Sequence, residues 1–534
     1  MTIMDALREY IFKMDITFTN VTMSLCFFVL LFALFKKMFP DAKTRDKLKV
    51  EKIIEHLCDK VLKGGPSDWD DFENNAKIRE KAIVNMALKN GNTFAMHCRG
   101  HVADALGTNR IIATCEPTLV KELFLNKVHT IKRPERYRLA QFLPGLDGVL
   151  FQDGERWKTH SRALIPVFHA SNFNQYARFM NEAAVVHVTQ TGWQKEVEKD
   201  LLKSIRQLAT TMVLAAGYGV DPLGEEGKQL RSAIYGYDEK ARFRWAGKNP
   251  FKLLFALGWV WWDAQRIKKA VKVIVDNRKT GNSRDVGSST NKPWKSAKTL
   301  NWIDRMIEFK FPLKDIYNEV NHLHAAHKAI AIIITFALYE IGLEKNISWQ
   351  TKLREELKSN FDIAHGKFPD KESIKKLPIA MSIWKETLRM HPISLGVLRE
   401  TGRDVETFVG TGDAKEKVVL PKGTPIQILL QAMHYHPKFW DTPEEFRPGR
   451  WIDADDTSQR STTSDLKVKN AFIPFLDGQR QCQGRFLAEL EFIVVLNAII
   501  LNYEISVPST YEFMLQPDFY PEMMHPIPLN VKKI

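Results

Sequence analysis

The most constraining stretch of the chain is Phe472–Glu491, FIPFLDGQRQCQGRFLAELE, in which a glycine-containing loop runs directly into an apolar, helix-forming segment. Cys482 lies just before that segment, where converging backbone N–H groups and the helix dipole favour a thiolate. Gly478 and Gly484, on either side, allow the backbone to approach a large flat group closely. Arg480 is a fixed cation that can clamp a carboxylate or phosphate. Together these features predict a haem iron held by a cysteine thiolate.

A lone cysteine before an apolar helix is more often a small buried residue than a ligand, so the prediction depends on the whole pattern. That pattern, F-x-x-G-x-R-x-C-x-G, is present as Phe475, Gly478, Arg480, Cys482 and Gly484. It resembles the haem loop of the cytochrome P450 superfamily, and the resemblance covers nearly the whole chain. The resemblance implies a mainly α fold with small β-sheets, in the α+β class, and haem b with Cys482 as the axial iron ligand. It also implies that the other four residues bind the cofactor.

The first sixty residues predict a membrane anchor. The twenty residues between Asp15 and Lys36 carry no charge, and such a stretch is long enough to cross a bilayer as a helix. Basic residues follow from Lys36 onward, which places the body of the protein in the cytosol. The expected parts are a lumenal N-terminus (1–16), a transmembrane anchor (17–36), a basic linker (37–60) and a haem-thiolate catalytic domain (61–534). By resemblance to eukaryotic microsomal members of the superfamily, the expected membrane is that of the endoplasmic reticulum.

Net charge and cysteine spacing narrow the classes of partner. The formal net charge of +14 suits an anionic lipid bilayer or an acidic protein, and no nucleic-acid motif accompanies it. The five cysteines have no paired spacing, which predicts neither a disulfide framework nor a zinc site. No Gly/Ser-rich linker clearly divides the chain behind the anchor, so we expect one large, monomeric catalytic domain.

Several other segments have a recognisable pattern. Residues 91–116 alternate and contain three glycines, which predicts short strands, and Pro117 then begins a helix. Ile316–Ile341 is typical of one long helix whose almost wholly apolar second half is buried. Phe251–Trp262 is too short to span a membrane. It is either a buried core helix or, by the resemblance, part of a roof over the substrate cavity that can dip into the bilayer.

Residues 145–173 resemble the superfamily segment whose tryptophan and following bases reach the haem propionates. Trp157 matches that tryptophan and is expected to contact the cofactor, with an ordinary core aromatic as the alternative. The superfamily usually has a base four residues later, whereas this chain has Ser161. Lys158, His160 and Arg162 are the neighbouring bases that can take its place.

The long apolar helix resembles the central helix that crosses above the haem. The superfamily pattern there is A-G-x-acid-T-T, in which an acid and an alcohol supply protons for oxygen activation. The matching residues 325–330 are Ala-Ala-His-Lys-Ala-Ile, so Lys328 replaces the acid and Ala329 replaces the first threonine. We expect His327, Lys328 and Ala329 in the catalytic site, with His327 contacting the haem edge, water or substrate. A second metal is not expected, because among the nearby histidines only His324 and His327 share a helix face.

Glu386 and Arg389 are three residues apart in a predicted helix, so they share a face and can pair. Such pairs are common on solvated faces and indicate little alone. Together with His-Pro at 391–392 and with Arg450, they resemble the superfamily's Glu-Arg-Arg triad, which implies a structural role behind the haem. Arg399 lies where the superfamily places another propionate-binding base. A surface arginine is the alternative for Arg399, although a bidentate carboxylate clamp suits the residue type.

The resemblance implies a haem-thiolate monooxygenase that inserts one oxygen atom of O2 into an apolar organic substrate, by hydroxylation or epoxidation. No flavin or NADPH fingerprint occurs in the chain, so the electrons of NADPH are expected to come from a separate NADPH–cytochrome reductase. Lys328 and Ala329 leave two alternatives open. One is a haem-thiolate isomerase, dehydratase or peroxide-using enzyme without an external reductase. The other is a haem-binding membrane protein without turnover.

Overall fold

The computed structural model describes short pieces of the chain before residue 147 and most of the chain after it. The described residues are 67–68, 84–85, 87–88, 92–97, 110–121, 123, 131–132, 147–169, 173–222, 224–240, 250–280, 301–362, 367, 369–394, 396–409, 416–452, 470–511, 513 and 525–534. The predicted lumenal N-terminus, transmembrane anchor and basic linker (1–16, 17–36 and 37–60) lie outside these residues. Within the described part, no helix combines the length and apolar character needed to cross a bilayer.

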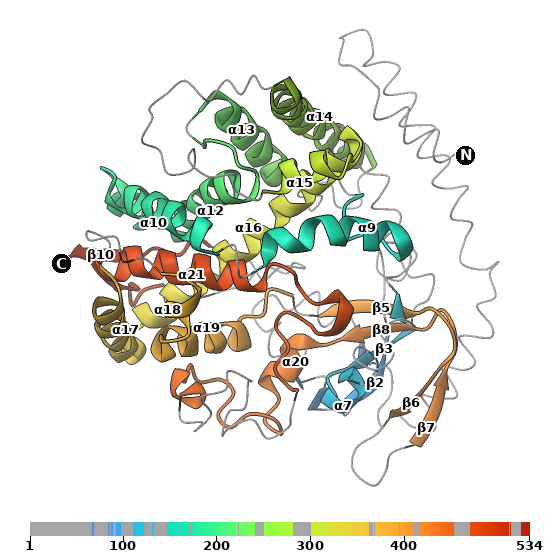
Figure 1. Ribbon diagram of the computed structural model, residues 1–534. Coiled ribbons are helices and arrows are strands. Elements are labelled where there is room, and N and C mark those ends of the chain that lie inside the picture. The colour runs from blue at the N-terminus through green and yellow to red at the C-terminus, as the bar shows by residue number, and fades with distance from the viewer. Residues whose placement is uncertain are drawn as a thin grey trace.

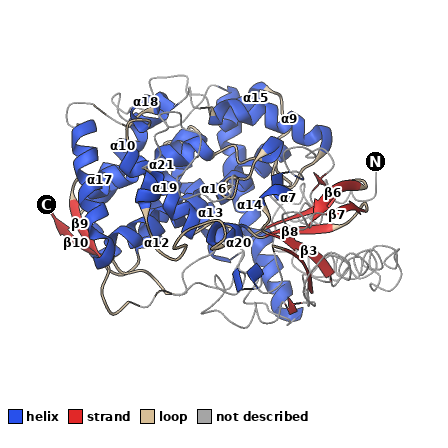
Figure 2. Cartoon of the chain, turned by 90° about the horizontal axis from the view of Figure 1, so that it is seen from below, coloured by secondary structure: helices blue, strands red, loops and turns tan. Residues whose placement is uncertain are grey.

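Helices make up most of the described fold, and α16 (Leu313–Gly342) runs through its middle (Figures 1 and 2). The other α-helices are α7 (Pro117–Lys121), α9 (Gly154–Leu164), α10 (Phe173–Thr189), α11 (Trp193–Val197), α12 (Leu201–Met212), α13 (Glu225–Lys240), α14 (Pro250–Thr280), α15 (Trp302–Glu308), α17 (Ile347–Asn360), α18 (Lys371–Ile374), α19 (Pro378–Met390), α20 (Leu430–Tyr435) and α21 (Arg485–Ile500). Shorter 3-10 or π segments are η3 (Ile165–Phe168), η5 (Val213–Gly217), η9 (Glu344–Asn346), η11 (Pro448–Trp451) and η12 (Gly478–Arg480).

The strands form one larger sheet and two antiparallel pairs. The six-stranded sheet has the order β1 (Ser67–Asp68), β2 (Thr93–His97), β3 (Arg110–Thr114), β8 (Pro425–Ile428), β5 (Val397–Thr401) and β4 (Ile131–Lys132). The two-stranded sheets are β6 (Val405–Val409) with β7 (Glu416–Leu420), and β9 (Tyr503–Ser506) with β10 (Asn530–Lys533). In Figure 2 the larger sheet and the β6–β7 pair lie at one end of the helical body, and the β9–β10 pair lies at the other. The prediction of a mainly α fold with small sheets is confirmed.

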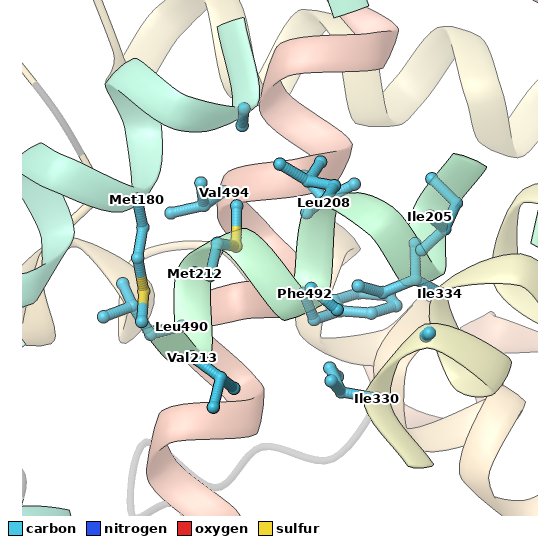
Figure 3. Packing of buried hydrophobic residues seen from close by; sticks show 14 of the residues in the cluster. Met180, Ile205, Leu208, Met212, Val213, Ile330, Ile334, Leu490, Phe492 and Val494 are labelled. Carbon is cyan, nitrogen blue, oxygen red and sulfur yellow. The ribbon is translucent and has the colours of Figure 1, made fainter. Parts of the chain in front are cut away.

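The core is centred on α21, the helix that follows the cysteine loop. Every residue from Glu489 to Ile500 is buried, because a helix that is apolar on all sides has to be enclosed by other elements. Figure 3 shows where α21 meets three other helices, through Leu490, Phe492 and Val494 of α21, Met180 of α10, Leu208 and Met212 of α12, and Ile330 and Ile334 of α16. Full burial of one such side chain stabilises the fold by about 1.5–3 kcal/mol. The loop that carries Cys482 is therefore attached to a helix whose last twelve residues are all buried.

Most of the element predictions agree with the structure. The short strands expected in 91–116 are β2 and β3, a helix does begin at Pro117, and the long central helix is α16. Phe251–Trp262 forms the first part of α14, which packs against α13 and α16. Trp259 and Trp262 of this segment are 46% and 47% exposed, so it is not a fully buried core helix.

Candidate active site

The loop before α21 is closed by its own backbone. The N–H of Cys482 donates to the carbonyl of Phe475 at 2.9 Å, and the N–H of Gln481 donates to the carbonyl of Gly478 at 3.1 Å. Leu476 (φ 59°) and Gly478 (φ 71°) both adopt the left-handed region, which glycine enters without steric cost. The predicted motif therefore forms a tight turn that presents Cys482 immediately before α21.

Burial and hydrogen bonding change the pKa of the Cys482 thiol in opposite directions. Burial raises the pKa of Cys482, and hydrogen bonds from the backbone N–H groups of Gly484 and Arg485 oppose that rise without cancelling it. Cys482 as a whole residue is nevertheless exposed. The sulfur is therefore enclosed by protein yet reachable. The two N–H donors offset part of the cost of a buried thiolate, and coordination to a metal would deprotonate the thiol fully.

Gly484 contributes no side-chain atoms to the surface beside the sulfur of Cys482. A Cβ built on Gly484 would lie 3.7 Å from a ring carbon of Phe168 and 3.9 Å from the sulfur of Cys482. Both are ordinary contact distances, so a methyl group fits, but it would stand next to the sulfur. Glycine at this position leaves room for a flat group to approach the backbone.

Arg480 and Trp157, which lie far apart in the sequence, contact each other. The guanidinium carbon of Arg480 is 3.7 Å from the centroid of the Trp157 ring, within the range of a cation–π contact. Nη1 of Arg480 donates to the carbonyl of Gln152 at 3.1 Å, and Nη2 donates to the carboxylate of Asp153. Burial lowers the pKa of Arg480, and the negative charge of Asp153 opposes that change. The haem loop and α9 thus present a cation and an aromatic ring side by side.

Buried charges fix α9 to α16. Nδ1 of His160 lies 2.6 Å from Oε1 of Glu319, and the two side chains are only 3% and 0% exposed. Arg156 bridges Asp147 and Asp315, at 2.7 Å from each carboxylate. Burial alone would lower the pKa of His160, but hydrogen bonds with Asp315 and Glu319 raise it to about 9. His160 therefore carries a proton at neutral pH and is paired with α16.

The three bases near Ser161 have different surroundings, and Ser161 itself is buried. Lys158 pairs with the exposed carboxylate of Glu155 at 2.5 Å. Arg162 is exposed, and His160 faces the carboxylates of α16. Lys158 and His160, two of the proposed substitutes for the missing base, are therefore already paired with carboxylates of the protein.

In the central helix α16, Lys328 and Ala329, which depart from the superfamily pattern, retain accessible surface. His327 is 1% exposed, whereas Lys328 and Ala329 are half-buried, and every residue from Ile330 to Leu338 is buried again. The side chains of 321–326, including His324, lie outside the described part of the structure. Lys328 and Ala329 therefore keep accessible surface between buried residues of the same helix.

Glu386, Arg389 and Arg450 meet in a fully buried cluster. Arg389 donates from Nε and Nη2 to the two oxygens of Glu386, at 3.0 and 2.8 Å, and Arg450 donates from Nε at 3.1 Å. The indole N–H of Trp451 and the backbone N–H of Arg447 also donate to Glu386, at 2.8 and 3.0 Å. Burial would raise the pKa of Glu386, but the charge of Arg389 lowers it below its ordinary value. The carboxylate is therefore held ionised in the interior.

Arg399 lies on β5, in the larger sheet. It is opposite Ile426 of β8, and its side chain is only 7% exposed. Its Nη1 donates to the carbonyl of Leu398 at 2.9 Å. Arg399 is therefore not the surface arginine considered as the alternative.

The sequence prediction missed three residues that contact predicted ones. Asp153 has the residue type of a helix cap, so its position alone suggested no bond to Arg480. Trp451 directly follows Arg450, but nothing in the pattern marks its indole as a donor to Glu386. Glu319 is a carboxylate inside a predicted buried helix, and this was the available sign that it needs a charged partner.

The described residues fit a haem bound through sulfur. The site offers a reachable sulfur with two N–H donors, a glycine that keeps the adjacent surface low, and a cation stacked on an aromatic ring. The sulfur suits the iron, and the guanidinium of Arg480 suits a propionate carboxylate.

Comparison with known proteins agrees with this chemistry. Residues 100–531 match the family model Cytochrome P450. Cytochrome P450 734A4 from Oryza sativa is 22% identical over 75% of this chain and 75% of its own length, and cytochrome P450 4F2 from Homo sapiens is 24% identical over 76% and 78%. Echinocystic acid 23-monooxygenase from Saponaria officinalis is 24% identical over 89% of this chain and 87% of its own length. The chain therefore belongs to the cytochrome P450 family, whose members are haem-thiolate oxidoreductases supplied with electrons by an NADPH-dependent reductase.

Proposed function

We propose that Cys482 is the axial thiolate ligand of haem b in this monooxygenase. The single observation that carries the proposal is the placement of Cys482 immediately before α21, in a turn closed by its own N–H, with Gly484 beside its sulfur. The backbone N–H groups of Gly484 and Arg485 oppose the rise in pKa that burial causes and would moderate the charge of a bound thiolate. The further cofactor contacts that we assign are Arg480, Arg399 and Trp157 toward the propionates, and Phe475, Gly478 and Gly484 toward the ring.

The proposed reaction inserts one atom of O2 into an apolar organic substrate, by hydroxylation or epoxidation, and releases the other atom as water after uptake of two electrons and two protons. A thiolate-bound haem supplies the cleavage of the O–O bond. The two electrons come from a separate NADPH–cytochrome reductase. The similarity to a protein named a monooxygenase supports this reaction class. The buried charges between α9 and α16, and the triad of Glu386, Arg389 and Arg450, keep the surrounding helices in place.

The proposed location is the membrane of the endoplasmic reticulum. Residues 17–36 would anchor the chain, with 1–16 in the lumen, and the linker 37–60 would lead to a monomeric cytosolic domain at 61–534. The uncharged run before Lys36 and the bases that follow it support this arrangement. Expression of a fluorescent fusion with and without residues 1–36 tests it, since the deletion should release the protein from microsomal membranes.

A second candidate function rests on Lys328 and Ala329. A half-buried lysine and a methyl group replace the acid and alcohol that supply protons for oxygen activation in the superfamily. A lysine ammonium at this position has rotatable N–H donors and can pass a proton to a neighbouring acceptor. Alternatively, the enzyme isomerises or dehydrates its substrate, or uses a peroxide, without an external reductase. Product formation with no reductase and no NADPH would favour this second candidate.

The experiment that tests the iron ligand is the absorbance of the reduced carbon monoxide complex. The wild-type protein should give the strongly red-shifted Soret band of thiolate ligation, and Cys482→Ser should lose that band while staying folded. Cys115→Ser is the matched control, because that buried cysteine has no assigned role. A folded wild-type protein without the band, or a Cys482→Ser variant that keeps it, would contradict the proposal. Retained haem with no product from a substrate panel would favour a non-catalytic haem protein.

A further inference from the structure

Asp153 occupies the cap position of α9 but makes no capping hydrogen bond. An aspartate immediately before a helix ordinarily accepts a bond from a backbone N–H two or three residues later. Here the backbone of Asp153 is extended, with φ −134° and ψ 172°, and its side chain accepts no such bond. Its carboxylate instead accepts a hydrogen bond from Nη2 of Arg480, 327 residues away in the sequence. Asp153 therefore forms a long-range hydrogen bond in place of a local capping bond.

Three groups from one short segment fix Arg480. The carbonyl of Gln152 accepts from Nη1, the carboxylate of Asp153 accepts from Nη2, and the ring of Trp157 lies against the face of the guanidinium. The side chain of Arg480 is 17% exposed and that of Asp153 is 30% exposed, so solvent screens the pair only in part. A guanidinium has five N–H donors, so it can hold these two acceptors and still donate to a further carboxylate.

We propose that Asp153 is a positioning residue that holds Arg480 against Trp157 and offsets its charge, and thereby keeps the reduction potential of the haem low. The inference rests on the proposed function, in which Arg480 contacts a haem propionate. With Asp153 present, the pair of Asp153 and Arg480 is neutral overall. Without the charge of Asp153, Arg480 leaves a net positive charge two residues before Cys482. This charge favours the ferrous state of the haem, which holds the additional electron.

The expected size follows from one unit of charge in a partly buried site. At an effective dielectric constant of about 20, a unit charge on the order of 12 Å from another charge changes an equilibrium that involves that charge by about tenfold. We therefore expect Asp153→Asn to raise the ratio of ferrous to ferric haem, at a fixed electrode potential, by about tenfold. For a one-electron couple, this is a positive shift of the midpoint potential by about 59 mV.

The test is a redox titration of purified, haem-loaded protein in four variants of the full chain. Asp153→Asn removes the charge, Asp153→Ser removes it but supplies another good helix cap, and Asp153→Glu keeps it. Glu155→Gln is the matched control, because it removes the same charge two residues away from an exposed pair with Lys158. We expect the positive shift in the Asn and Ser variants, and wild-type potentials in the Glu variant and the control.

The rate of haem transfer to an apoprotein acceptor is the second readout. Release of Arg480 from Asp153 should speed haem loss in the Asn and Ser variants relative to Glu155→Gln. Potentials and transfer rates of both variants equal to those of the control would overturn the proposal, and so would the same shift in Asp153→Glu. Failure of the proposed function has a different signature, since the wild-type protein would then lack the red-shifted carbon monoxide band.

Discussion

The buried carboxylate of Glu386 allows a quantitative prediction for the substitution Glu386→Gln. Glu386 accepts hydrogen bonds from Arg389, Arg450, Trp451 and the N–H of Arg447, and the side chains of Glu386, Arg389 and Arg450 are all 0% exposed. Glutamine has nearly the same shape, but it carries no charge and turns an N–H₂ group toward one of these donors. Two guanidinium groups would then be buried without their counter-ion.

The size of the stability loss depends on the hydrogen bonds that Arg389 and Arg450 retain in the variant. Arg389 still donates to the carbonyls of His434, Pro443 and Glu445, and Arg450 still donates to those of Asp441 and Thr442. These hydrogen bonds to carbonyls remain in the variant. The cost in stability should therefore equal that of one broken buried ion pair, and not twice that cost for the two arginines. Removal of one partner of such a pair costs about 3–5 kcal/mol. We expect the free energy of unfolding to fall by about 4 kcal/mol.

Urea unfolding followed by circular dichroism measures this loss. Glu155→Gln is the control, because it also neutralises a glutamate paired with a base, but one that is 80% exposed. Exposed pairs contribute little, so the control should unfold like the wild type. If Glu386→Gln retains the wild-type free energy of unfolding, the triad does not stabilise the fold in the way described.

Three further predictions concern other parts of the structure. The pKa of His160 is raised to about 9 in the folded state, so protonated His160 should stabilise the fold fully below about pH 6.5. This contribution to the free energy of unfolding, on the order of 3 kcal/mol, should be lost as the pH rises to about 9. His160→Gln should remove this pH dependence, as measured by unfolding titrations at several pH values. Gly217→Ala should lower stability by about 1–3 kcal/mol, because its Cβ would lie 2.6 Å from the ring of Trp302, whereas Gly258→Ala, with no atom within 4 Å, should not. The double substitution Lys328→Asp with Ala329→Thr should raise NADPH-driven turnover if the enzyme is a monooxygenase. Unchanged NADPH use with unaltered peroxide-dependent product would favour the second candidate function.

The sequence predicted the elements well, because local patterns determine them. The apolar run of α16 and the loop–helix junction at Cys482 are visible as periodicity and composition over a few turns. The spacing of Glu386 and Arg389 places them on one helix face, and the structure pairs them. Each of these inferences needs only neighbours along the chain.

Partners across the fold could not be predicted in the same way. His160 and Glu319 are 159 residues apart, and Asp153 and Arg480 are 327 residues apart. Periodicity indicates that a residue lies on a buried face, but not which element packs against that face. The sequence offers His160 as a base for the haem propionates, whereas the structure pairs it with Glu319 of α16. A buried charge needs a partner, but the identity of the partner depends on tertiary packing.

These long-range bonds hold the cysteine loop from two directions. On one side, Asp153 and Trp157 of the α9 region hold Arg480. On the other side, the N–H of Ile473 donates to Nε2 of His434 at 3.3 Å, and the carbonyl of His434 accepts from Arg389 at 2.9 Å. Burial lowers the pKa of His434 to about 3, so its ring stays neutral and can accept that bond at any physiological pH. The buried triad therefore reaches the loop through His434, and a loss of charge at Glu386 should disturb the position of Cys482 as well as the stability of the fold.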